Sequence, residues 1–304
     1  MRSLLLIGAI SIFAFFGCSE ENPPTQNPPA STQLTLNING LEDLGANAVY
    51  EGWIIVPGTA KSGGGEIAIS TGTFTVDANG NLSQTVFDVD PNDLSCATTF
   101  VLTIEPNPDP DPNPSAVHIL GGDFSNKSAN ISTDHGAALG VDFSTATGNY
   151  ILATPTNGPN TNENSGIWFL DISSGSPSQG LFLPTLPDGW KYEGWTVING
   201  VPVTTGTFTS TTDFDDDDPY SSSMFPGPPF PGEDFLINPP SGLTFPTDIM
   251  GGLAVISIEP SPDNSTAPFT LKPLVGNIPV GAADHKTYMM NTNLSSFPTG
   301  SATR

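Results

Sequence analysis

Basic residues are scarce in this chain of 304 residues. Seven lysines and arginines stand against 31 aspartates and glutamates, so the formal net charge is −24 at pH 7. A surface of this sign repels phosphate groups, which excludes nucleic acid and anionic membrane surfaces as direct ligands of the folded part. The charge instead suits a soluble extracytoplasmic protein that is exposed to divalent cations.

Helical patterns, long apolar runs and common catalytic motifs are lacking too. No window keeps a helical period, and the apolar run at residues 4–16 is too short to span a bilayer. Charged residues make up 12 % of the chain, against 32 glycines and 31 prolines, which favours strands joined by loops. Gly-x-Ser-x-Gly, His-Glu-x-x-His and glycine-rich phosphate loops do not occur, so those enzyme classes have no support.

The first eighteen residues resemble the signal of a bacterial lipoprotein. Arg2 precedes the apolar run, which ends in Gly17-Cys18. A small residue and a cysteine after such a run resemble a lipobox, although Phe15 stands where that motif usually has leucine. We therefore expect residues 1–18 to be a signal peptide and Cys18 to carry the lipid. A cleaved secretory signal with an incidental cysteine is the alternative.

The residues after Cys18 predict where the protein is held. Ser19-Glu20-Glu21 resembles the acidic surface-export tag of some Gram-negative lipoproteins, and the polar segment 19–33 with its four prolines predicts an extended tether. No later segment could span a bilayer, so the lipid anchor would be the only attachment to the membrane. We expect an extracytoplasmic protein, lipid-anchored at the bacterial outer membrane or cell surface.

The rest of the chain repeats itself. Residues 41–53 return at 183–195 with the same Tyr-Glu-Gly-Trp, and two later motifs follow in the same order in each copy. This pattern indicates a tandem duplication and predicts two folded units, residues 34–160 and 161–304. The repeated framework residues are Tyr50, Glu51, Trp53, Gly72, Phe74, Glu105 and Pro106, matched by Tyr192, Glu193, Trp195, Gly206, Phe208, Glu259 and Pro260.

Short strand patterns dominate both units. We expect strands at residues 34–38, 50–56, 66–76, 82–89, 98–105, 116–120 and 149–153, and again at 166–172, 192–198, 202–209, 234–237, 253–259 and 270–275. Short strands with Gly/Pro-rich turns predict an all-β fold of two tandem antiparallel β-sandwich domains of the immunoglobulin-like kind. We expect the repeated tryptophans to be buried, the Gly-x-Phe glycines to permit a bulge, and each Glu-Pro to end a strand.

The order Tyr-x-x-Trp, Gly-x-Phe and Glu-Pro resembles the extracytoplasmic C-terminal domain of anti-sigma-K factors of the RskA type. The resemblance covers about residues 41–122, here called the first repeat, and 183–276, the second repeat. Such factors join this outer domain through a membrane helix to a sigma-binding domain, and neither part is seen here. Asn107-Pro108 and Ser261-Pro262 also replace the usual Gly-Gly. The resemblance therefore implies the fold and a sensing or binding role.

Three sets of polar residues are candidates for chemistry. The densest acidic run comprises Asp213, Asp215, Asp216, Asp217 and Asp218. Clustered carboxylates suit Ca²⁺, but this run lacks the spacing of an EF-hand loop. We therefore expect a solvated loop, with a Ca²⁺ site as the alternative. We do not expect Asp134-His135 or Asp284-His285 to pair, because adjacent strand residues point to opposite faces. We expect the repeated glutamates to accept hydrogen bonds at sheet edges and strand ends.

These observations favour a non-enzymatic binding or sensing module with no resident cofactor other than the alternative Ca²⁺. Its partner would be an envelope protein or a glycan. Two other hypotheses remain open. One is a hydrolase acting on a glycan or envelope polymer, with Glu51 and Glu105 as acid and base, and the other is a structural or adhesive surface module.

Overall fold

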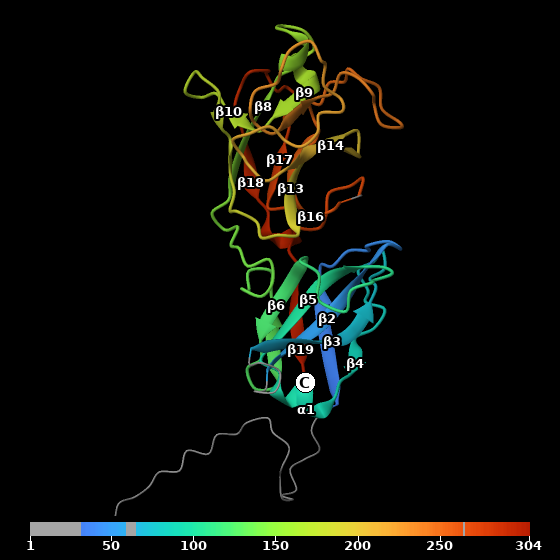
Figure 1. Ribbon diagram of the computed structural model, residues 1–304. Helices are drawn as coiled ribbons and strands as arrows, with labels where there is room; N and C mark the ends of the chain where they lie inside the picture. Colours follow the sequence, from blue (N-terminus) through green and yellow to red (C-terminus); the bar gives the residue numbers. More distant parts are fainter. Residues whose placement is uncertain (1–31, 59–64, 264) are drawn as a thin grey trace, which may run out of the picture.

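The computed structural model describes residues 32–58, 65–263 and 265–304, and over these ranges the protein is nearly all β. Its sheets are antiparallel and form two groups stacked end to end (Figure 1). The predicted all-β class is confirmed, and the arrangement is β-sandwich-like. Within the described ranges, no helix has the length and apolarity needed to cross a membrane.

The first group contains two four-stranded sheets. One has the order β4-β1-β19-β7 and the other β3-β2-β5-β6. Both contribute to one hydrophobic core, in which β1 buries Leu34, Leu36 and Ile38 at alternate positions. The strands are β1 (Gln33–Asn39), β2 (Ala48–Pro57), β3 (Glu66–Phe74), β4 (Val86–Asp88), β5 (Thr99–Pro106), β6 (His118–Asp123), β7 (Ser128–Ile131) and β19 (Thr299–Thr303).

The second group is built on one nine-stranded sheet. Its order is β14-β13-β16-β17-β18-β8-β9-β15, and β12 pairs with β8 at the side. The strands are β8 (Thr147–Leu152), β9 (Gly166–Trp168), β12 (Leu181–Phe182), β13 (Trp190–Ile198), β14 (Val201–Phe208), β15 (Gly232–Asp234), β16 (Leu253–Pro260), β17 (Leu274–Asn277) and β18 (Tyr288–Thr292). β10 (Leu170–Asp171) and β11 (Ser178–Gln179) form a small ribbon.

Helical segments are short. Among the described residues the α-helix is α1 (Pro91–Cys96), and the 3₁₀ turns are η2 (Pro155–Asn157), η3 (Glu163–Ser165) and η4 (Leu294–Ser296). The sequence pattern did not predict α1, which has only six residues. It begins where Asp90 accepts a hydrogen bond from Asn92 N at 2.8 Å and Pro91 occupies the first helical position. The strand expected at residues 82–89 is shorter in the structure, where β4 covers Val86–Asp88.

The two repeats have the same local geometry. β2 pairs with β3 through a bulge that leaves Thr71 extra, and β13 pairs with β14 through a bulge that leaves Thr205 extra. Gly72 and Gly206, which follow the extra residue, have φ of +118° and +107°. This confirms the predicted bulge, since residues with a side chain rarely adopt such angles.

The bulge also explains the glycine of Tyr-Glu-Gly-Trp. A Cβ added to Gly52 would lie 2.5 Å from Thr71 Oγ1, and one added to Gly194 would lie 2.2 Å from Thr205 Oγ1. The hydroxyl of each bulge residue therefore occupies the space above the glycine. The neighbouring aromatics stack as pairs, with ring centroids 5.5 Å apart for Tyr50–Phe74 and 5.6 Å for Tyr192–Phe208.

A hydrogen-bond relay links the central strands of each repeat. Trp53 Nε1 donates to Thr103 Oγ1 at 2.9 Å, and that hydroxyl donates to Glu105. In the second repeat Trp195 Nε1 donates to Ser257 Oγ at 2.8 Å, and Ser257 donates to Glu259. Both tryptophans are buried, as predicted. Each Glu-Pro ends its strand, β5 at Pro106 and β16 at Pro260, also as predicted.

The strand pairing does not follow the expected division at residue 160. β8 lies in the nine-stranded sheet, where it pairs with β18 and β9, although residues 34–160 were expected to form the first unit. The last strand, β19, returns to the first group and pairs with β1 and β7 (Figure 1). Both pairings join strands from opposite sides of residue 160 or from opposite ends of the chain, and pairing between distant strands leaves no local pattern in the sequence.

We expect the return of β19 to be essential for the first group of sheets. Ala302 is fully buried there, so Ala302→Asp should lower the free energy of unfolding by about 3 kcal/mol or more, because it buries an unpaired charge. Urea denaturation of the full chain measures this effect.

Thr303→Asp is the matched control, because Thr303 is exposed on the same strand and its substitution should change stability by less than about 0.5 kcal/mol. Equal effects of the two substitutions would contradict the burial of β19.

Candidate functional site

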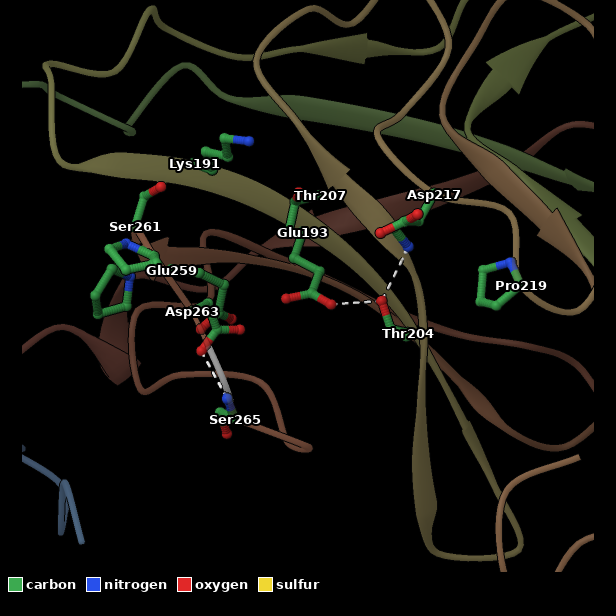
Figure 2. A pocket seen from close by; sticks show the side chains of 13 residues that line it. Lys191, Glu193, Thr204, Thr207, Asp217, Pro219, Glu259, Ser261, Asp263 and Ser265 are labelled. Carbon is green, nitrogen blue, oxygen red and sulfur yellow. Dashed lines mark hydrogen bonds between the residues drawn. The ribbon is translucent and has the colours of Figure 1, made fainter. Parts of the chain in front are cut away.

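The end of β16 and the turn after it line two adjoining hollows. One is a pocket of about 400 Å³ on the face of β13 and β14, and the other is a pocket of about 700 Å³ between the two repeats. Figure 2 shows the first pocket from close by. The residues common to both are Glu259, Pro260, Ser261, Pro262, Asp263 and Ser265. The pocket on β13 and β14 is called the second-repeat pocket below. The pocket between the repeats is called the inter-repeat pocket.

Three carboxylates meet in the second-repeat pocket, and we call them the carboxylate cluster. Glu193 comes from β13, Glu259 from the end of β16, and Asp263 from the turn after β16 (Figure 2). One oxygen of each lies within 4.8 Å of the others. The side chains of Glu193 and Glu259 are only 5 % and 1 % exposed, whereas Asp263 is half-buried.

Local hydrogen bonds hold one oxygen of each carboxylate. Thr204 Oγ1 donates to Glu193 Oε1, and its own oxygen accepts from Gly206 N at 2.9 Å beside the β14 bulge. Glu259 Oε1 accepts from Ser257 and from Phe269 N at 2.9 Å. Asp263 Oδ1 accepts from Ser265 N at 2.8 Å. The orientations of the carboxylates are therefore fixed by the strand bulge and the turn.

The remaining glutamate oxygens of the cluster are buried without a partner. Glu193 Oε2 and Glu259 Oε2 accept no hydrogen bond from the protein. Burial raises the pKa of Glu193 to about 8, and the nearby charges of Glu259 and Asp263 act in the same direction, as does a carboxyl–carboxyl hydrogen bond with Asp263 that needs a proton on one of the two groups. Burial likewise raises the pKa of Glu259 to about 7, with added repulsion from Asp263 and Glu42. The three carboxyl groups are thus close together in a partly buried setting that favours the protonated forms of the two glutamates.

The first repeat places the same residue types differently. Glu51 is half-buried and accepts from Ser70, and Glu105 is buried but has both carboxylate oxygens within 2.9 and 3.1 Å of Ser115 N. Burial raises the pKa of Glu51, and repulsion from the charges of Glu105 and Asp109 acts in the same direction. Within the described ranges, Glu193, Glu259 and Asp263 are the one group of three side chains with metal-ligand spacing.

The inter-repeat pocket combines acidic and apolar walls. The first repeat contributes Glu42, Leu44 and Val117, and the second contributes Phe269 next to the turn after β16. Burial raises the pKa of Glu42 to about 7, although Lys272 of the second repeat acts to lower it. A direct contact also joins the second repeat to the residue just before the first repeat, because Thr270 Oγ1 donates to Gly40 O at 3.1 Å. The pocket is therefore a hollow between two repeats that are held side by side in this structure.

The aspartates of the acidic run have different partners and surroundings. Asp215 Oδ2 accepts from Gly232 N at 2.9 Å, and burial raises the pKa of Asp215 to about 8. Asp216 pairs with Lys191 Nζ at 2.7 Å, while Asp217 lines the second-repeat pocket. Asp213 and Asp218 are exposed. No three of these aspartates fall among the described groups with metal-ligand spacing, and the Ca²⁺ site considered for the run stays a prediction.

One of the two Asp-His neighbour pairs differs from expectation. His285 Nδ1 lies 3.1 Å from Asp284 Oδ1, because His285 has a φ of +49° and is not in a strand. The prediction that these neighbours would not pair is therefore wrong. His135 Nε2 instead lies 3.4 Å from Asp123 Oδ1, and both His285 and Asp284 are more than half exposed. Cys18, the predicted lipid acceptor, lies outside the described residues.

Sequence reasoning named Glu193 and Glu259 but not Asp263. The signal for Asp263 was present in the aligned turns, since Asp109 and Asp263 occupy matching positions after Glu-Pro. Comparison with protein-family models, curated proteins and solved structures finds no match to this chain.

Glu233 is a buried carboxylate outside the two pockets, and it gives a prediction about how stability depends on pH. Glu233 is fully buried on β15, where it accepts from Ser221 and Tyr220 N, and burial raises its pKa to about 8. The folded state then keeps a proton that the unfolded chain loses above about pH 4.5, so this contribution to stability is full below pH 4.5 and is lost as pH rises through 8.

We expect Glu233→Gln to be more stable than the unsubstituted chain at pH 9, and the difference to shrink or reverse at pH 5. Urea unfolding between pH 4 and 9 measures it, with exposed Glu66→Gln as the control. A difference that does not change with pH would contradict the assignment.

The carboxylate cluster gives a further prediction. In a chelating buffer at pH 8, Glu193→Gln should raise the melting temperature by about 2–4 °C, because an amide removes one buried charge and can donate to Glu259 Oε2. Differential scanning calorimetry measures the shift. Glu51→Gln, at the matching half-exposed position, should change it by less than 1 °C or so. A lower melting temperature for Glu193→Gln would show that the charges do not repel.

Proposed function

We propose that the protein is a lipid-anchored, extracytoplasmic binding or sensing module of the bacterial envelope, made of two immunoglobulin-like β-sandwich domains of the RskA type. Its ligand is held in the inter-repeat pocket. The observation that carries this proposal is the hollow of about 700 Å³ between the repeats, lined by both of them and kept in place by contacts such as Thr270 to Gly40.

The chemistry of the pocket walls suggests the class of ligand. Carboxylates such as Glu42 and Asp263 lie beside the apolar side chains of Leu44, Ile104 and Phe269. A segment that combines basic and apolar side chains matches these walls, and the net charge of −24 draws such a partner from solution. We therefore place the partner among envelope proteins with an exposed basic segment, ahead of neutral glycans.

The duplicated framework supports a sensing role of the anti-sigma-factor kind. The motifs of the resemblance build the bulged strands and the Trp-hydroxyl-Glu relay of each repeat. These strands end at the pockets, because β5 and β16 carry Glu105 and Glu259 to their walls. A ligand bound in the inter-repeat pocket would thus contact strand ends of both repeats.

The hydrolase alternative has less support. It needs two carboxyl groups roughly 5–10 Å apart in an open cleft, free to exchange protons with a substrate. Glu105 is 1 % exposed and accepts a hydrogen bond from Ser115 N, while Glu51 accepts one from the Ser70 hydroxyl. Glu259 is likewise bound to Phe269 N and to the Trp195 relay. A purely structural stalk would have no need of the inter-repeat hollow.

Filling the pocket tests the proposal. Ala48 lies in its wall, so Ala48→Trp should weaken binding of a labelled hexapeptide of alternating lysine and leucine at least tenfold in 150 mM salt. Glu42→Lys should do the same by reversing a wall charge. Fluorescence anisotropy measures the affinity.

Glu66→Lys is the control for non-specific attraction, because it makes the same charge change on the exposed start of β3, and it should leave the affinity within about twofold. Failure of the unsubstituted protein to bind the peptide, or equal binding by all variants, would count against the pocket. Preferential binding of a neutral glycan oligomer would reassign the ligand class.

A further inference from the structure

We propose that Glu193, Glu259 and Asp263 form a Ca²⁺ site in the second repeat. The site is separate from the ligand proposed above, and its argument does not depend on that function. It also differs from the acidic run, whose aspartates point to different partners.

The first argument is the unmet hydrogen-bonding capacity of the cluster. Glu193 Oε2 and Glu259 Oε2 belong to side chains that are more than nine-tenths buried, and neither accepts a hydrogen bond. Buried polar atoms in folded proteins are nearly always partnered, because an unpaired one costs free energy. No described lysine, arginine or histidine forms an ion pair with the cluster. Lys191 lines the pocket but pairs with Asp216, and Lys272 acts on Glu259 without an ion pair.

The second argument is the geometry. The three ligand oxygens lie within 4.8 Å of one another, which a single ion bound at about 2.3–2.6 Å can bridge. The protein already orients each carboxylate through a hydrogen bond to one of its oxygens, from Thr204, Ser257 and Ser265. Figure 2 shows the three side chains gathered at one side of the pocket. The open pocket of about 400 Å³ leaves room for water to complete the coordination.

The donor set indicates which ion would bind. All three ligands are carboxylates, so hard cations are favoured over zinc or copper, which prefer nitrogen and sulfur. The ligands come from two strands and a turn, so the protein backbone sets their positions rather than the preferred geometry of an ion. Ca²⁺ accepts six to eight oxygens in flexible arrangements, whereas Mg²⁺ demands near-ideal octahedral geometry. The cluster therefore favours Ca²⁺.

The first repeat is a natural comparison. Glu51, Glu105 and Asp109 occupy the matching sequence positions, yet Glu105 has Ser115 N within reach of both oxygens and Glu51 is half-exposed. They do not form a group with metal-ligand spacing among the described side chains. In the second repeat, Asp217 and Pro219 of the segment after β14 line the pocket beside Glu193. The duplication has thus produced one partnered and one unpartnered version of the same cluster.

The test is Ca²⁺ titration of the purified full chain after dialysis against a chelator. Isothermal titration calorimetry should show one ion per chain, and 1 mM Ca²⁺ should raise the melting temperature by several degrees through mass action. Glu193→Gln and Asp263→Asn should each weaken Ca²⁺ at least 30-fold and remove most of the thermal shift. Mg²⁺ should bind at least tenfold more weakly than Ca²⁺.

The matched controls are Glu51→Gln and Asp109→Asn in the first repeat and Asp216→Asn in the acidic run, all of which should keep the Ca²⁺ affinity within about threefold. Melting curves in chelator show whether each variant is folded, so loss of binding by a folded Glu193→Gln supports the site. Absence of Ca²⁺ binding to the unsubstituted chain overturns the proposal. Unchanged affinity in Glu193→Gln, or loss confined to Asp216→Asn, overturns it as well.

Discussion

The hydrogen bond from a buried tryptophan to a hydroxyl, and from that hydroxyl to a buried glutamate, recurs in both repeats and holds their central strands together. Trp53 and Trp195 reach across to β5 and β16, and Glu105 and Glu259 then hold the backbone N–H of Ser115 and Phe269. Each link satisfies a polar group that burial would otherwise leave unpaired. The strand ends, and hence the walls of both pockets, take their positions from this relay.

Buried carboxylates are the second constraint on this molecule. A chain with a net charge of −24 nevertheless buries Glu105, Glu233, Asp234 and Glu259 almost completely. Most of them are held by backbone N–H and hydroxyl donors, as when Asp234 accepts from Thr156 N and Trp168 Nε1. Such donors offset the loss of hydration. The carboxylate cluster departs from this rule, because two of its oxygens have no donor within reach.

Duplication and divergence explain why one cluster differs from the other. The bulge, the stacked aromatic pair and the relay are the same in both repeats, so they belong to the fold. Glu51 and Glu193 have the same neighbours in sequence, yet one is half-exposed and the other almost fully buried. The difference arises from segments that are not repeated, notably the insert that carries Asp217 and Pro219 to the second-repeat pocket. A site can therefore appear in one copy without any change in the framework.

The sequence by itself determined the all-β class, the duplication, the bulge at the Gly-x-Phe glycines and the ends of β5 and β16. These features follow from local rules, such as the need for glycine at positive φ and the inability of proline to continue a ladder. Only the tertiary structure decided that β8 joins the second group of sheets, that β19 returns to β1, and that Asp263 meets Glu193 and Glu259. Those contacts join residues far apart along the chain, and burial depends on what covers a side chain rather than on its neighbours in sequence.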